Sequence, residues 1–443
     1  MPLYWAFSSS LEQGSILVGT CTPLFCKNPN TAMHIVLLSD KYHQPGASAG
    51  VTAMLAEGYA QQGHRVSVIT SHRSEEESTI RNQDYVISLP ISYSLKLRHY
   101  KCLKQKHVSR MLDDVFRELR PDIVHAHNIH MYLTYDALRI ARKYTKNVFI
   151  TMHDAMNFNY GRLNTKRFLD SEGKDVRTTP LDHIRQAGLQ YNPLRNCIIR
   201  HILRKNVVKV CAVSHALKSA LDVHGIPRTQ VVHNGIDTNF WKADRKGAQR
   251  FRKKNRFEDR KIILFGGRLS RDKGSTPLLH ALNRVRALVP NVMLVVLGDP
   301  KRWKGLLQEA HVPANLSAQI TTIDWLSRED LRAAYSAANV VTTPSLCLDT
   351  FNLMNAEAMA CSTPVVGTCF GGTPEVVKDS ATGFIRNPLK TEEYAEALVT
   401  LLADDTLAKH MGEAGRKRVE KKFSMEKCVE TYLNIFADSL NCS

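Results

Sequence analysis

The chain has 443 residues, of which 43% are hydrophobic and 23% are charged, and its formal net charge is +18. This length suits two domains of ordinary size, and the composition excludes a disordered or fibrous chain. No apolar run approaches the roughly 18–20 uncharged residues of a membrane-spanning helix, so any membrane contact is expected at the surface. The excess positive charge indicates attraction to an acidic partner, such as an anionic lipid surface, a nucleic acid or a phosphorylated substrate.

The ten cysteines show neither metal-ligand spacing nor a compact disulfide framework. Several lie among apolar or small residues, where a free thiol behaves as a small hydrophobic group. We therefore expect a reducing compartment, the cytoplasm. Residues 1–32 lack the basic and apolar regions of a signal peptide. We expect them to form a disordered leader, with Met33 as an alternative translation start.

From Met33 onward, short β-branched apolar runs alternate with stretches of helical period. The first half predicts a helix over 51–62 and strands at 34–38, 65–70, 123–125, 148–150 and 208–211. Parallel strands joined by helices form sheets that are covered on both faces. Residues 155–196 show no clear periodicity, and a loop of this length inside a compact domain is usually functional or mobile.

The second half repeats the pattern. It predicts helices at 275–288, 328–338 and 351–361 and strands at 262–265, 292–297, 340–341 and 364–366. An exposed basic stretch at 242–261 precedes these elements, and an amphipathic helix at 425–440 follows them. The sequence thus predicts an α/β protein with two doubly wound domains that meet near residue 238.

Residues 266–274 follow one of these strands and precede a helix, which is where ligands bind in a doubly wound domain. Glycines let a ligand approach the backbone, and the helix N-terminus favours an anion. Arg268 offers a planar fork and Lys273 a mobile point charge, which together suit a diphosphate. The alternative is a turn with solvated basic side chains. The glycine spacing matches neither a Walker loop nor a dinucleotide fingerprint.

Residues 344–360 also connect a strand to a helix. We expect Thr350 to cap this helix, so that the amides of residues 351–353 face an anion. Asp349 in the loop and Glu357 about two turns into the helix are spaced to reach different parts of one ligand, a sugar hydroxyl and a ribose diol. Because small and apolar residues flank Glu357, we expect it to be buried and either paired or ligand-bound.

These motifs, followed by Gly-Gly-Thr-Pro-Glu at 371–375, resemble those of glycosyltransferase family 4 over roughly residues 33–435. The resemblance implies the GT-B fold: two Rossmann-like domains facing across a cleft, with the C-terminal helix crossing back to the first. It implies an acceptor-binding domain at 33–238, completed by 424–443, and a nucleotide-sugar-binding domain at 239–423. It further implies retention at the anomeric carbon, with no cofactor and no required metal.

The resemblance also implies roles for individual residues. Arg268 and Lys273 would neutralise the donor diphosphate as the glycosidic bond breaks, which is electrostatic stabilisation of developing charge. Asp349 would contact the donor sugar and Glu357 the ribose, while His153 would lie beside the sugar. The catalytic set is then Arg268, Lys273, His153 and Asp349. The donor-binding set is Gly50, Gly267, Phe351, Asn352, Leu353 and Glu357, and the acceptor side holds His127 and Asp154.

The sequence departs from the family pattern at three positions. Asp349 stands where glutamate is usual and is shorter by about 1.5 Å, one C–C bond. Asn352 stands where glycine is usual, and Ala49 replaces one glycine of a Gly-Gly loop. These changes keep open a noncatalytic scaffold subunit that binds nucleotide-sugars. A phosphorylase of the GT-B fold is disfavoured, because such enzymes carry a long C-terminal domain for which this sequence has no extra length. A nucleic-acid-binding protein is disfavoured, because it would leave the pair Asp349 and Glu357 unexplained.

Basic residues alternate with apolar ones over 95–110 in the first domain. We expect this segment to contact an anionic membrane at its inner face, the alternative being a solvated basic helix. The donor is expected to be a UDP-sugar, with a GDP-sugar left open, and the transferred group a hexose or N-acetylhexosamine. The acceptor is expected to be a glycan or a lipid-linked intermediate, and no nucleic-acid partner is expected.

Overall fold

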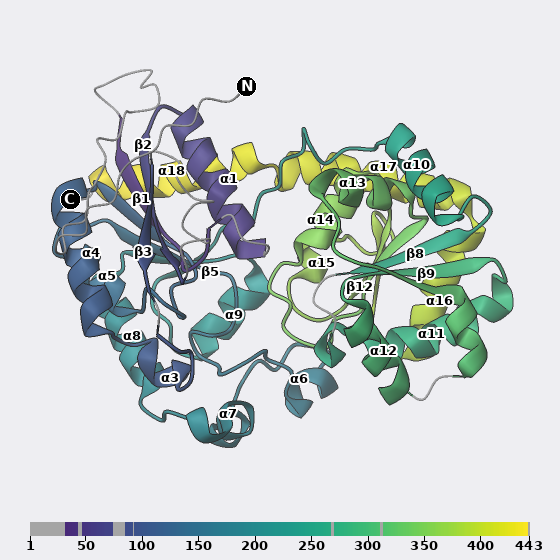
Figure 1. Cartoon of the computed structure of the whole chain (residues 1–443), viewed down its shortest axis with the longest axis horizontal. Helices are drawn as coiled ribbons and strands as arrows, with labels where there is room; N and C mark the ends of the chain where they lie inside the picture. Colours follow the sequence, from purple (N-terminus) through teal and green to yellow (C-terminus); the bar gives the residue numbers. More distant parts are fainter. Residues whose placement is uncertain are drawn as a thin grey trace, which may run out of the picture.

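The computed structural model describes residues 32–42, 47–73, 85–91, 93–266, 270–310 and 313–441. Except for residue 32, the leader predicted at 1–32 lies outside the described residues. Two parallel sheets with flanking helices lie side by side in the described chain (Figure 1), which confirms the predicted α/β fold with two Rossmann-like domains.

The first sheet has seven strands, all parallel, in the order β3-β2-β1-β4-β5-β6-β7. The central strand β1 is buried along its whole length, as expected for a parallel strand covered on both faces. The strands are β1 (His34–Leu38), β2 (Arg65–His72), β3 (Val86–Pro90), β4 (Ile123–Ala126), β5 (Val148–Met152), β6 (Lys209–Ala212) and β7 (Thr229–Val231).

The helices of the first domain cover both faces of this sheet. They are α1 (Ala47–Gln61), α3 (Arg98–Lys101), α4 (Lys106–Leu119), α5 (Asp136–Ala141), α6 (Lys166–Asp170), α7 (Pro180–Ala187), η1 (Gly188–Gln190), α8 (Arg195–Asn206) and α9 (His215–Val223).

The segment 155–196 is more regular than predicted, because it contains α6, α7 and η1. Local capping specifies these helices. The Thr165 hydroxyl accepts a hydrogen bond from the backbone of α6, and Thr179 forms a capping box with Asp182 at the start of α7. Short capped helices carry little apolar periodicity, so a search for helical period overlooks them.

The second sheet has six parallel strands in the order β10-β9-β8-β11-β12-β13. Its strands are β8 (Lys261–Gly266), β9 (Val292–Leu297), β10 (Ile320–Ile323), β11 (Val340–Thr343), β12 (Val365–Thr368) and β13 (Gly383–Arg386). Its helices are α10 (Arg245–Asn255), η2 (Arg271–Lys273), α11 (Ser275–Leu288), α12 (Pro300–Glu309), η3 (Ala314–Gln319), α13 (Arg328–Ala337), α14 (Leu353–Ala360), α15 (Thr373–Val376), α16 (Thr391–Ala403) and α17 (Asp405–Lys422).

The prediction that 242–261 is an exposed basic stretch is wrong in part. Helix α10 packs against α13, and its Phe251 is buried. Arg252 is half-buried, and its guanidinium donates to the backbone oxygens of Ala337 and Phe257. This arginine therefore holds the two helices together, while the other basic side chains of α10 face solvent.

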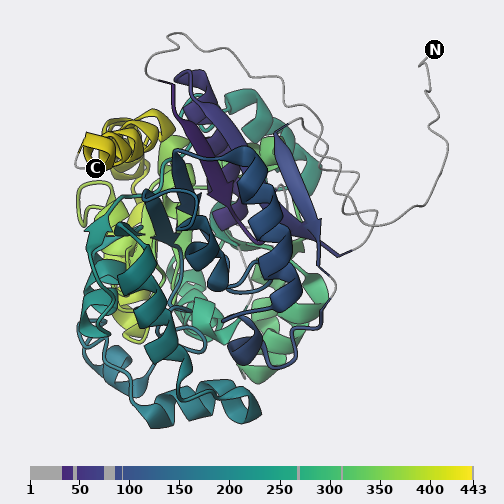
Figure 2. The same cartoon turned by 90° about the vertical axis from the view of Figure 1, so that its left-hand side faces the viewer.

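The last helix, α18 (Met425–Asn441), leaves the second domain and packs on the first (Figure 1). In Figure 1 its yellow ribbon passes behind the strands of the first domain, and in the turned view it lies at one edge of the molecule (Figure 2). The Tyr432 hydroxyl lies 2.8 Å from the Thr151 hydroxyl of β5, and Ser439 donates to the Asn147 side chain. Tyr432 and Phe436 are buried, in a core cluster shared with β1 and α1. The predicted crossing of the C-terminal helix is confirmed.

Loops at the carboxyl ends of the two sheets meet each other. The Thr350 hydroxyl, after β11, donates to the backbone oxygen of His153, after β5, at 2.6 Å. This bond brings the loop after β5, which carries His153, against the loop after β11, which carries Asp349. Within the described part of the chain, no helix is both long and apolar enough to cross a bilayer.

Candidate active site

The turn between β8 and α11 carries the predicted diphosphate-binding residues. Gly267 and Arg268 lie outside the described residues. Lys273 ends η2, and its ammonium group donates to Asp349 Oδ2 at 2.5 Å. Gly274 follows with a φ of 76°, and a Cβ there would collide with the carbonyl oxygen of Pro344. Glycine is thus required where this turn packs against the loop after β11.

Asp349 is the centre of a small polar network. Besides Lys273, its Oδ2 accepts hydrogen bonds from the Ser345 hydroxyl at 2.9 Å and the Asn352 amide at 3.0 Å. Burial works against ionisation, but the Lys273 ammonium and the hydroxyl of Ser345 hold the pKa of Asp349 below its ordinary value. A carboxylate therefore faces an ammonium at neutral pH.

Helix α14 begins at Leu353 without a side-chain cap, so the prediction that Thr350 caps it is wrong. The Thr350 hydroxyl is committed to the other domain through His153. Asn352 occupies the position before the helix with a φ of 56°, in the left-handed region. Glycine tolerates this conformation best and asparagine is the usual substitute, so the same backbone is kept by a different residue. The first amides of α14 remain without a side-chain acceptor among the described residues.

Glu357 is partly buried inside α14, as predicted, and its partner is a tyrosine. The hydroxyl of Tyr335, on α13, donates to Glu357 Oε2 at 2.9 Å. Burial raises the pKa of Glu357 to about 7, although this hydrogen bond opposes the rise. The carboxyl group thus changes its charge near neutral pH.

The side chain of Phe351 points away from the predicted donor site. It is buried against Phe423 and lies 6.1 Å, between ring centroids, from His233 in the segment that joins the domains. Only its backbone is available for a ligand. Leu353 packs between two core clusters, so its side chain is structural and its amide alone fits the predicted role.

Three histidines form a row at the carboxyl ends of β4 and β5, with His125 and His127 buried and His153 partly exposed. His127 Nδ1 lies 2.9 Å from His153 Nε2, and the His125 ring lies within hydrogen-bond distance of Tyr59 and Thr151 inside the core. Burial lowers the pKa of His153 to about 4 and that of His127 well below its ordinary value. Both rings are neutral at pH 7, which suits them to hydrogen bonding rather than to general-acid catalysis. His127 Nε2 is buried and finds no partner among the described residues.

Two predicted residues occupy other settings. Asp154 is half exposed, accepts the Met156 amide at 2.9 Å and lies 3.7 Å from His130, so it stabilises the turn after β5. Gly50 lies in the first turn of α1, and not in the loop before it as predicted. It is exposed, and a Cβ there would meet no atom within 4 Å. A glycine in a first turn leaves orphan amides open to approach.

Sequence reasoning missed a set of contacts from the segment 155–196. Arg162 Nη1 donates to the Ser270 hydroxyl at 2.8 Å, and the Asn164 amide donates to Asp272 at 2.8 Å. The backbone oxygen of Leu163 accepts the Leu348 amide. These bonds hold a first-domain loop against the Lys273 turn and add a guanidinium beside it. The segment has no periodicity, so no local signal reveals them.

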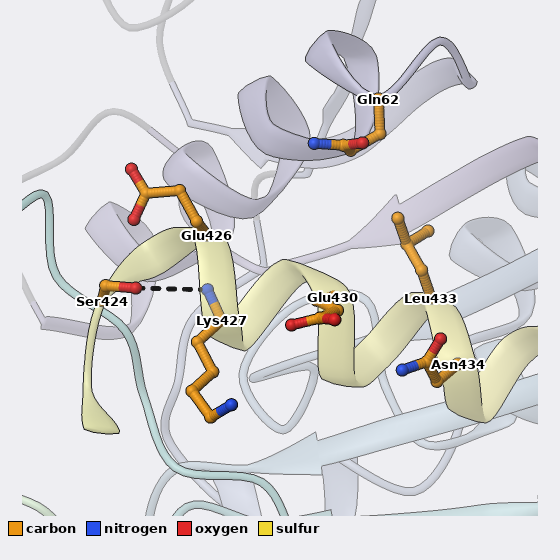
Figure 3. A pocket seen from close by; sticks show the side chains of 7 residues that line it. All are labelled: Gln62, Ser424, Glu426, Lys427, Glu430, Leu433 and Asn434. Carbon is orange, nitrogen blue, oxygen red and sulfur yellow. Dashed lines mark hydrogen bonds between the residues drawn. The ribbon is translucent and has the colours of Figure 1, made fainter. Parts of the chain in front are cut away.

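Two surface hollows lie apart from these residues. One follows the outer face of α18 and the end of α1, where Gln62, Glu426 and Glu430 line it (Figure 3). The other lies where the domains join, and three of its lining residues, His215, His233 and Glu375, form a group with metal-ligand spacing. None of the predicted site residues lines either hollow.

Family models match both parts of the chain. Residues 49–240 match Glycosyltransferase Family 4, and residues 248–418 match Glycosyl transferases group 1. The alpha-maltose-1-phosphate synthase of Mycolicibacterium smegmatis is 35% identical over 222 residues, which cover 47% of this chain and 56% of that protein. The chain thus spans little more than half the length of this relative. The N-acetyl-alpha-D-glucosaminyl L-malate synthase of Bacillus anthracis is 26% identical over 406 residues, which cover 90% of this chain and 96% of that protein.

Solved structures share the fold at lower identity. Anabaena HepE in complex with UDP and glucose superposes with a TM-score of 0.69 at 18% identity, over 92% of this chain and 100% of that one. The sucrose-phosphate synthase of Thermosynechococcus elongatus gives a TM-score of 0.70 at 20% identity, over 93% of this chain and 100% of the other.

Proposed function

Because the chain belongs to the glycosyltransferases of family 4 and group 1, which have the GT-B fold, we propose that it transfers a sugar from a nucleotide-diphosphate donor to a hydroxyl group of an acceptor. The reaction retains the configuration of the anomeric carbon. The transferred group is a hexose or an N-acetylhexosamine, and the acceptor is a glycan or a lipid-linked intermediate.

The contact between Lys273 and Asp349 is the observation that carries the proposal. It joins the turn after β8 to the loop after β11, so a cation and a carboxylate stand together where doubly wound domains bind ligands. A diphosphate that binds this turn takes Asp349's place beside the ammonium. Asp349 is then released from the ammonium and accepts from a hydroxyl of the donor sugar, while Lys273 neutralises the leaving group.

The neighbouring residues fit the rest of a nucleotide-sugar. Glu357 lies on α14 with its second oxygen open to a ribose diol, and the amides of residues 351–353 suit a phosphate. Neutral His153 is oriented by His127 and anchored to Thr350, so it is suited to hydrogen-bond a sugar hydroxyl. The acceptor hydroxyl attacks on the leaving-group side, and a phosphate oxygen accepts its proton.

The donor is proposed to be a UDP-sugar, in line with the UDP bound by the structurally similar Anabaena HepE. A GDP-sugar is the alternative. Because Arg268 and Lys273 supply positive charge at the leaving group, the reaction is proposed to need neither Mg²⁺ nor Mn²⁺.

The donor proposal is tested with UDP-, GDP- and ADP-sugars, by thermal stabilisation and by sugar release. One nucleotide is expected to stabilise the wild type and support turnover, and Lys273→Ala is expected to lower kcat by about 10²–10³-fold, the usual cost of one transition-state donor. Lys304→Ala, which removes an exposed lysine of α12, is the matched control. Binding without turnover would mean a scaffold subunit, and no binding by any nucleotide would exclude the site.

We also propose that the first domain rests on an anionic membrane, with the segment 95–110 as part of the contact. The structure adds exposed apolar side chains beside it: Tyr100 donates to the Tyr191 backbone, which brings α3 against the end of η1. Leu189 is fully exposed. The exposed apolar residues of the segment 95–110, α7 and η1 are Leu97, Tyr100, Leu181, Ile184 and Leu189, and the exposed basic residues are Lys96, Lys104, Lys106, Arg110 and Arg185. Apolar side chains can insert between the lipid headgroups while the basic side chains around them attract the anionic bilayer.

Co-sedimentation with vesicles of phosphatidylglycerol or of phosphatidylcholine tests this surface. Binding is expected to the anionic vesicles alone and to be lost in Leu189→Glu. Leu288→Glu, which changes an exposed leucine of the second domain, is expected to bind as the wild type does. Equal binding to both vesicles, or none to either, would exclude the membrane contact.

A further inference from the structure

Two histidines and a glutamate meet where the two domains join. His215 begins α9, His233 follows β7, and Glu375 belongs to α15 of the second domain. A ring nitrogen of each histidine and a carboxylate oxygen of Glu375 all lie within 4.8 Å of one another. We propose that these side chains bind a divalent transition-metal ion of the zinc class, and that the ion cross-links the two domains.

Glu375 is already held as a metal ligand would be. Its Oε2 accepts the His215 amide at 2.8 Å, and its Oε1 accepts the Ala216 amide at 2.9 Å. Hydrogen bonds that fix a ligating carboxylate in this way commonly support metal sites.

The spacing of His233 and Glu375 needs only a small adjustment, whereas ligand atoms up to 4.8 Å apart must approach by up to about 1.5 Å. His233 Nε2 lies 2.9 Å from Glu375 Oε2, whereas ligand atoms around tetrahedral zinc, with bonds of about 2.0–2.1 Å, stand about 3.3 Å apart. The ion thus replaces the hydrogen bond between His233 and Glu375, and the two ligand atoms move apart by a few tenths of an ångström. His215 is exposed, so its ring turns freely toward the other two ligands. Water completes the coordination.

The charges around the site select the kind of metal. Arg418, Lys422 and Lys427 line the same hollow and oppose any cation. Arg418 is directed at the backbone oxygens of Glu375 and Val376, and the two lysines are exposed and therefore screened by solvent. An ion must gain enough from its ligands to offset this repulsion. Two imidazoles and a carboxylate do so for zinc, nickel or copper, whereas Mg²⁺ and Ca²⁺ prefer oxygen ligands.

Occupancy of this site affects both domains. The ligands come from α9, from the segment that joins the domains and from α15, so the ion links elements that otherwise separate when the domains move apart. The His233 ring also packs near Phe351, which precedes the uncapped start of α14. The ion is therefore expected to stiffen the junction beside the proposed donor site.

Cobalt(II) titration of the full chain tests the site. The experiment uses a Cys197→Ser background, which removes the exposed thiol found among the described cysteines. One cobalt ion per chain is expected, with the visible absorption of a four-coordinate site and no thiolate charge-transfer band. Zinc is expected to displace it and to raise Tm by roughly 2–5 °C at a hundredfold excess over Kd.

Three variants separate this site from other histidines. His215→Ala and Glu375→Gln are expected to weaken cobalt binding by at least about tenfold, while His410→Ala, an exposed histidine of α17, binds as the parent does. His215→Ala keeps its fold because the side chain is exposed. No cobalt binding, equal binding in His215→Ala, or stabilisation by inorganic phosphate in place of zinc would overturn the proposal. These readouts are binding measurements and do not depend on transfer activity.

Discussion

The carboxyl group of Glu357 lies in surroundings that oppose its charge. Its pKa is about 7 in the folded protein and near 4.5 in the unfolded chain, so between these values the folded state holds a proton that the unfolded state releases. The stability that the neutral carboxyl contributes is therefore fully present below pH 4.5 and is lost as the pH rises through 7.

Glu357→Gln keeps the side chain neutral at every pH. The variant is expected to match the wild type at pH 5 and to exceed it by up to about 3 kcal/mol at pH 8.5, from a shift of about 2.5 units. Urea unfolding at the two pH values measures the difference. An equal difference at both would show that Glu357 ionises normally.

Asn352 keeps a left-handed backbone at the entrance to α14. Asn352→Ala is expected to lose about 1 kcal/mol of unfolding free energy, because an ordinary side chain is strained there, whereas Asn352→Gly is expected to be neutral or slightly stabilising. Chemical denaturation ranks the three proteins. Equal unfolding free energies for Asn352→Ala and Asn352→Gly would show that the left-handed backbone does not determine which residue is favoured at this position.

At the scale of elements, the contact between α1 and α18 depends on a missing side chain. A Cβ at Gly58 would overlap Val429 Cγ2. Gly58→Ala is thus expected to destabilise the protein by about 1–3 kcal/mol through overpacking. In a Val429→Ala background the same change is expected to stabilise by up to about 1 kcal/mol, because alanine favours a helix over glycine. A double-mutant cycle of unfolding free energies measures this reversal, and additive effects would exclude the clash.

The elements that the sequence predicted well are long or central. The helix at 275–288 and the strand at 292–297 match α11 and β9 in both bounds. The strands without a prediction are β3, β7, β10 and β13, and each lies at an edge of its sheet. Edge strands are covered less completely, so they lack the continuous apolar run that marks a central parallel strand.

The candidate site was predictable only to the extent that its residues form motifs. Lys273, Asp349 and Glu357 stand in motifs that the sequence displays, whereas Tyr335, the partner of Glu357, does not. A tyrosine in α13 reaches Glu357 only because two helices pack together. Pairings of this kind depend on tertiary structure, which no local pattern encodes.

At the scale of the whole molecule, Arg162 is a first-domain side chain that reaches the Lys273 turn of the second domain. Arg162→Ala is expected to lower kcat/KM by about 10-fold or more, because a misplaced closing contact costs catalysis. Its Tm is expected to change little, since the residue lies outside both cores. Donor turnover and thermal unfolding are compared with Arg185→Ala, an exposed arginine of α7. Unchanged kinetics would assign Arg162 to packing alone.

The crossing of α18 has a consequence for how the protein is made. Tyr432 closes the core over Thr151, a residue that precedes it by 281 positions in the chain. At about 5–20 residues per second, a ribosome needs roughly 15–55 s to cover that distance. In the part of this interval that follows the synthesis of β7, the nascent first domain has its sheet but not the helix that seals it, and the apolar groups around Tyr59 and Phe149 are exposed. The domain that emerges first is thus the last to be completed, which makes the unfinished chain a natural client for chaperones.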